Sequence, residues 1–106
     1  MNWEIDELES RARTQLSRMQ DFSDRLGAIA VRETSPDGMV SIEVDGVGGV
    51  RGIELSPQAG RLGASRLGET IVATAALAAQ RAFARRARIT EEFTESFAEL
   101  LGSRPR

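Results

Sequence analysis

The 106-residue sequence contains no cysteine, histidine, lysine or tyrosine. Without cysteine the chain can form neither disulfides nor thiolate metal sites. Without histidine it lacks the usual general base and the commonest metal ligand. The absence of lysine and tyrosine removes two further side chains that carry out catalysis. We therefore expect a protein that is not an enzyme and that holds neither a metal nor a cofactor.

Long hydrophobic runs are also missing. No apolar stretch approaches the ~20 residues that cross a bilayer, and the first ten residues, MNWEIDELES, are acidic and polar, unlike a signal peptide. The five aromatic residues are Trp3, Phe22, Phe83, Phe93 and Phe97. We expect a cytoplasmic protein without membrane contact. Residues 1–106 should form a single domain, whose small core is of the kind that gains stability by pairing with a second copy.

Turn-forming and β-branched residues concentrate between residues 28 and 56 and predict a three-stranded antiparallel meander. Residues 40–45 read VSIEVD, the alternation of a strand that buries one face. The sequence SPDG at 35–38 suits a type I turn, and the glycines of DGVGG at 45–49 supply the next turn. The strands should each span only about 20 Å.

Helical patterns flank the meander, which makes the fold class α+β. Residues 2–26 carry apolar residues with heptad spacing, typical of a helix packed along another helix. At ~1.5 Å per residue this helix is nearly twice as long as the sheet, so about half of it should project. Residues 65–88 and 90–101 predict a second long helix and a short C-terminal helix, followed by a tail over 102–106. The apolar seam expected to bind a second copy or another partner consists of Ile5, Leu8, Met19, Phe22, Phe93 and Phe97.

The order of these elements, together with SPDGMVSIEVDGVGGVRGIEL at 35–55, LGETIVATA at 67–75 and AQRA at 79–82, resembles the YbaB/EbfC family. These are small bacterial nucleoid-associated proteins, and the resemblance, to an actinobacterial-type member, covers residues 2–90. It implies a homodimer whose helical arms protrude and bind double-stranded DNA in the nucleoid, without enzymatic activity.

The acidic segment after Arg88 and the net charge of −2 depart from this family pattern. Actinobacterial relatives include accessory components of specialised secretion systems. A protein-protein interaction module without DNA binding is therefore the alternative function.

All fourteen basic residues are arginine, whose planar guanidinium group suits phosphate recognition. A GC-rich genome would produce the same bias. The candidate DNA contacts are Arg81, Arg85 and Arg88, at i, i+4 and i+7 of the second helix, and Arg11, Arg13 and Arg18 of the first. Such contacts would give salt-sensitive, sequence-independent binding. The alternatives are a solvated helix face, pairing with Glu91, Glu92, Glu95 and Glu99, or ion pairs between helices.

Overall fold

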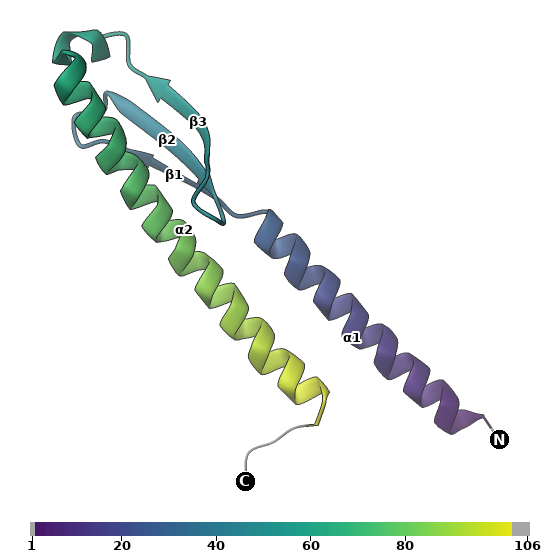
Figure 1. Cartoon of the computed structure of the whole chain (residues 1–106). Helices are drawn as coiled ribbons and strands as arrows, with labels where there is room; N and C mark the ends of the chain where they lie inside the picture. The colour runs from purple at the N-terminus through teal and green to yellow at the C-terminus, as the bar shows by residue number, and fades with distance from the viewer. Residues whose placement is uncertain (1, 103–106) are drawn as a thin grey trace.

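A computed structural model describes residues 2–102 (Figure 1). Its elements follow the predicted order of helix, meander and helix. They are α1 (Trp3–Gly27), β1 (Ala30–Thr34), β2 (Val40–Asp45), β3 (Val50–Leu55), the 3-10 helix η1 (Ala59–Leu62) and α2 (Ala64–Leu100). The α+β class is confirmed.

The three strands form an antiparallel sheet in the order β1-β2-β3. One face of β2, made by Val40, Ile42 and Val44, is fully buried, while the residues between them face outward. The first part of α2 lies across this apolar face and covers β1 and β2. Ala78 and Ala82 of α2 are fully buried against the sheet, because their small side chains allow a close approach. The core is therefore built around the predicted meander.

Local hydrogen bonds close both turns of the meander. In the first turn the amide of Gly38 donates to the carbonyl oxygen of Ser35 at 2.9 Å, as in a type I turn. In the second turn Gly48 has a φ of +82°, and a Cβ added to it would lie 2.8 Å from the Cζ atom of Phe83. Only glycine meets both the backbone and the space requirement at position 48.

The predicted break between residues 88 and 90 is wrong, because α2 is one helix of 37 residues. Residues 90–100 are helical as expected, but they continue the same helix. Neither glycine nor proline interrupts this stretch. The hydroxyl of Thr90, expected to cap a new helix, donates instead to the carbonyl oxygen of Arg86 at 2.9 Å, within the helix. The predicted tail lies outside the described residues except for Gly102.

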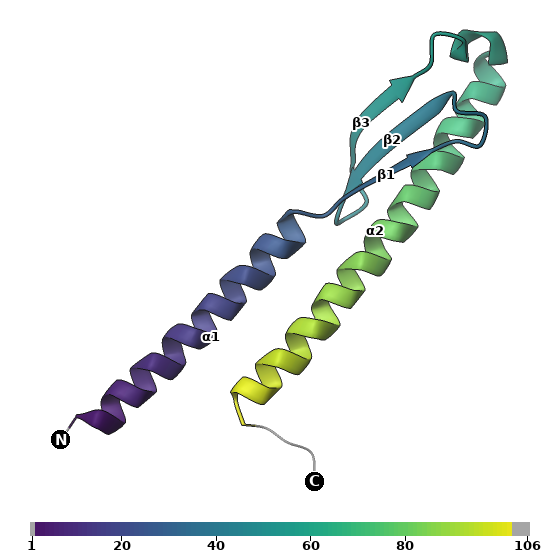
Figure 2. The same ribbon diagram turned by 180° about the vertical axis from the view of Figure 1, so that it is seen from behind.

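The molecule is elongated, with extents of 76 × 28 × 15 Å. Figures 1 and 2 show α2 running along the sheet and then onward beside α1, which is antiparallel to it. The expectation that half of α1 would lie on the sheet is wrong, since all of α1 projects beyond it and none of its residues is buried. Because α2 already occupies the apolar face of the sheet, that face is closed to α1.

Candidate nucleic-acid interface

The two helices beyond the sheet, α1 and the last part of α2, are held together by an aromatic stack. The ring centroids of Phe22 and Phe93 are 4.2 Å apart, and those of Phe93 and Phe97 are 5.1 Å apart. Beside the stack, Nη2 of Arg25 donates to Oε1 of Glu92 at 2.8 Å. We call this pair of helices, α1 and residues 88–100 of α2, the arms. Their contact is narrow and lies close to the sheet end of α1.

The predicted apolar seam is therefore divided between two environments. Phe22, Phe93 and Phe97 pack against one another within the chain. Ile5, Leu8 and Met19 lie farther along α1 and are 59%, 66% and 49% exposed. The structure brings the phenylalanines together and leaves the other three side chains on the surface.

Three of the six candidate arginines make contacts within the chain. Arg81 forms an ion pair with Glu33 of β1, and Nη1 of Arg85 donates to the carbonyl oxygen of Ala30 at 3.2 Å. Arg18 donates to the hydroxyl of Ser96. The face that was predicted to track phosphates therefore also ties α2 to the edge of the sheet.

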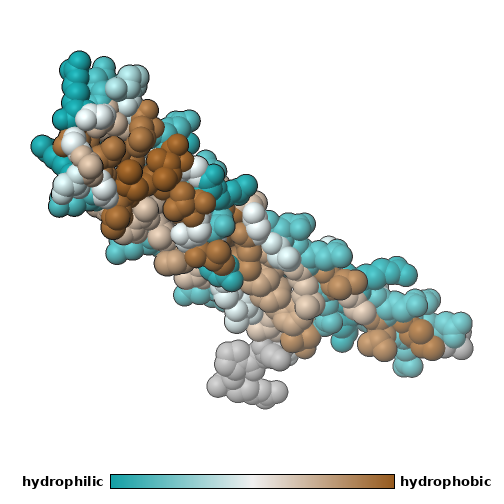
Figure 3. Space-filling view, turned by 45° about the horizontal axis from the view of Figure 1, so that its top comes forward, coloured by the Kyte–Doolittle hydropathy of each residue, from teal (hydrophilic) through white to brown (hydrophobic). Residues whose placement is uncertain are grey.

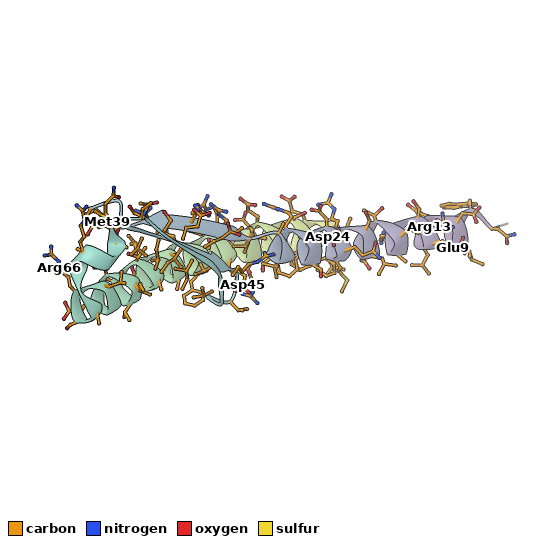
Figure 4. All side chains as sticks on the ribbon, turned by 90° about the horizontal axis from the view of Figure 1, so that it is seen from above. Glu9, Arg13, Asp24, Met39, Asp45 and Arg66 are labelled. Carbon is orange, nitrogen blue, oxygen red and sulfur yellow. The ribbon has the colours of Figure 1, made fainter. Side chains whose placement is uncertain are left out.

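The other three candidates are Arg11, Arg13 and Arg88. Each is exposed, and its guanidinium group has no hydrogen bond or ion pair to another of residues 2–102. Figure 4 shows Arg13 on the outer part of α1, well beyond the sheet. These guanidinium groups are available to an anion in solution. The structure does not gather all six arginines into one patch.

The acidic group after Arg88 does not pair with the arginines that precede it in α2. Glu92 instead pairs with Arg25 of α1, the kind of ion pair between helices that heptad positions commonly carry. The sequence analysis offered ion pairs between helices as an alternative for the arginines of α1, and it paired Glu92 with the arginines of α2 instead of with Arg25.

Sequence reasoning missed Arg51 and Arg86 as candidates. Both line a cavity of about 340 Å³ at the base of α1, together with Leu26, Gly27, Asp45, Gly46 and Val47. Arg86 is half-buried. A helical projection of α2 could have separated Arg86 from Arg81, Arg85 and Arg88, since it lies on a different flank. Nothing in the sequence indicated that Arg51 would line the same cavity as Arg86.

The strongest electrostatic perturbation lies in the β1–β2 turn. A hydrogen bond from the hydroxyl of Ser35 and a second from the amide of Met39 lower the pKa of Asp37. This carboxylate anchors the turn and belongs to the sheet end of the molecule (Figure 4, where Met39 marks the turn). Its role is structural.

Metal-binding clusters and membrane-spanning helices were both sought among the described residues. Within residues 2–102 no group of three or more histidine, cysteine, aspartate or glutamate side chains is placed to hold a metal ion. In the same range no helix combines the length and the apolar character needed to span a bilayer.

No curated protein matches the chain. The model of the YbaB/EbfC DNA-binding family matches residues 1–97, which include the sheet and nearly the whole of both arms. This match extends past Arg88, where the resemblance was expected to fade. The chain belongs to the YbaB/EbfC DNA-binding family.

Proposed function

We propose that this single-domain protein acts as a homodimer in the bacterial cytoplasm, where it binds duplex DNA of the nucleoid without catalysing a reaction. Arginine side chains on its long helices contact phosphate groups. The observation that carries the proposal is the match to a DNA-binding family over residues 1–97. Because phosphate contacts are independent of sequence, the expected binding has little base preference and weakens steeply with salt.

Arg11, Arg13 and Arg88 are the phosphate contacts that need no rearrangement, since they are exposed and unpartnered among residues 2–102. Arg18, Arg81 and Arg85 would exchange their present partners for phosphates. Arg18 and Arg85 would give up exposed hydrogen bonds, which costs little. Arg81 would leave behind the carboxylate of Glu33, whose side chain is only 12% exposed, so its exchange costs more. Only the first group is free in the unbound protein.

Exposed apolar side chains support the proposed homodimer. Ile53 and Leu55 of β3 pair with the buried Ile42 and Val40, yet both are 48% exposed because α2 does not extend over β3. On the adjoining flank of α2, Phe83 is 50% exposed. Figure 3 shows apolar side chains gathered at the sheet end of the molecule. A second copy packed against the apolar side chains of Ile53, Leu55 and Phe83 would bury this surface, and the exposed seam residues of α1 could extend the contact.

The test combines light scattering with fluorescence anisotropy of a labelled duplex in a salt series. We expect the mass of a dimer and a linear fall of log affinity with log salt concentration, with a slope of about 0.9 per phosphate contact. The variant Arg11→Gln/Arg13→Gln should lower the slope by about 1 for each arginine that binds a phosphate in the wild-type protein. The matched control Gln20→Ala, also exposed on α1, should leave it unchanged. A wild-type protein that shows no binding even at low salt would contradict the proposal.

A second candidate function is supported by the distal end of α1. Trp3, Ile5 and Leu8 are 58%, 59% and 66% exposed, and the four acidic residues among them, Glu4, Asp6, Glu7 and Glu9, would repel DNA. An acidic amphipathic end of this kind suits a protein-protein interaction module, such as an accessory of a secretion system. If purified protein fails to bind duplex, this candidate predicts a stoichiometric protein partner whose binding is abolished in the variant Ile5→Asp/Leu8→Asp.

A further inference from the structure

We propose that Arg51 and Arg86 form an oxyanion site at the base of α1, in which a DNA backbone phosphate binds. This inference rests on the proposed function and adds a site outside the two arginine stripes. Both side chains line the cavity of about 340 Å³ between the end of α1, the β2–β3 turn and α2. Figure 4 locates this region by Asp45, between the sheet and α1.

The strand pairing indicates that Arg51 is placed there by a local irregularity. Glu43 of β2 pairs with Gly52 and Val44 pairs with Val50, so the register skips Arg51. Such a bulge leaves one residue outside the ladder and redirects its side chain, and bulges are enriched beside binding sites. The side chain of Arg51 accordingly lines the cavity at the base of α1.

Arg86 differs from Arg81 and Arg85 in that its guanidinium group has no partner among residues 2–102. Arg81, one turn earlier in α2, pairs with Glu33, and Arg85 donates to a carbonyl oxygen of β1. The guanidinium groups of the half-buried Arg86 and of the exposed Arg51, which lines the same cavity, make no hydrogen bond or ion pair to another of residues 2–102. Two unpaired guanidinium groups at one cavity repel each other, and the partial burial of Arg86 removes some of the water that would screen its charge. An anion would relieve both costs.

Asp45 is the acidic residue that lines the cavity, but its carboxylate is engaged in the turn. Its Oδ1 atom accepts hydrogen bonds from the amides of Val47 at 3.1 Å and Gly49 at 2.8 Å. No guanidinium nitrogen of residues 2–102 lies within 4.0 Å of it. The lining therefore keeps a net charge of +1. A phosphodiester, with one negative charge and two oxygens for a pair of guanidinium forks, matches this lining.

The test compares Arg51→Gln/Arg86→Gln with Arg61→Gln/Arg66→Gln, which removes the same charge at the far tip, where Figure 4 shows Arg66. We expect the first variant to lower the salt slope of duplex binding by about 1 per protomer, while the second keeps the wild-type slope. In wild-type protein, inorganic phosphate should shift the amide resonances of Gly27, Gly46 and Val47. The first variant should abolish those shifts.

If the wild-type protein binds duplex and Arg51→Gln/Arg86→Gln shows the same salt slope, the phosphate site is refuted and the proposed function stands. A wild-type protein that does not bind duplex would overturn both, and phosphate-induced shifts in that case would mark a site for free oxyanions. If the variant instead loses its dimeric mass by light scattering, the arginines pair with carboxylates of a second copy, and the phosphate site is refuted.

Discussion

The sheet end and the arms of this molecule are stabilised by different means. At the sheet end Val40, Ile42 and Val44 are fully removed from water beneath α2. In the arms, α1 has no buried residue, and it meets the rest of the chain through the stack of Phe22 on Phe93, through Leu26, which packs against the core, and through a few polar contacts. Most of the folding core therefore lies at the sheet end, and Ile89 extends it into the first turn of the α2 arm. Beyond this junction the apolar residues of α1 are exposed within one chain.

The largest expected effect comes from removing core volume at the sheet. Ile42→Ala should lower the free energy of unfolding by about 2–5 kcal/mol, because the side chain is fully buried. Leu16→Ala in α1, where the side chain is 58% exposed, should change it by less than about 0.5 kcal/mol. Urea titrations of both variants at one protein concentration give the comparison. Equal losses would show that the arms contribute to the core as much as the sheet does.

A glycine substitution tests how closely the β2–β3 turn approaches α2. Gly48→Ala should cost about 1–2 kcal/mol, since it combines a left-handed backbone with a contact against the ring end of the half-exposed Phe83. Gly38→Ala has a similar positive φ but open space around it, so its cost should be only about 1 kcal/mol. Thermal unfolding measures both. A cost for Gly48→Ala that does not exceed that of Gly38→Ala would remove the claim of close packing.

Removing the aromatic stack should destabilise the arms and leave the sheet unaffected. Phe93→Ala eliminates both ring contacts and should cost about 1–2 kcal/mol. Hydrogen exchange should accelerate in α1 and in the last turns of α2, whereas the amides of β2 keep their protection. Thr94→Ala, an exposed neighbour in the same helix, serves as the control. Accelerated exchange throughout β2 would mean that the sheet depends on the arms.

The smallest effect concerns acid stability at the sheet end. Hydrogen bonds to its ionised form lower the pKa of Asp37 in the folded protein. Its stabilising contribution is therefore present above the unfolded pKa of about 4 and is lost as the pH falls through the lower folded value. Asp37→Asn should reduce stability slightly at neutral pH, and the difference from wild type should shrink in acid. If the stability difference between Asp37→Asn and wild type grows on acidification, the pKa of Asp37 is not lowered in the folded protein.

The meander was predictable because its signals are local. The turn sequence at 35–38 and the alternation at 40–45 determine a hairpin without help from distant residues. The continuity of α2 was not predictable, because Thr90 can either cap a helix or bond back within one. The pairing of Arg81 with Glu33 joins residues 48 positions apart. The cavity beside Arg51 depends on a shift in strand register. Contacts of these kinds follow from packing and not from any local pattern.

The most direct test of the account is the affinity of the purified protein for a duplex measured against salt concentration. With six or more phosphate contacts per dimer, affinity should fall by at least about 10³-fold between about 50 and 200 mM salt, and Arg11→Gln/Arg13→Gln should flatten the dependence. Leu16→Ala, which changes no charge, should leave it unaltered. Binding that is absent at the lowest salt, or whose salt dependence is the same in the arginine variant, would contradict the claim that the arms of this family member hold DNA through their arginines.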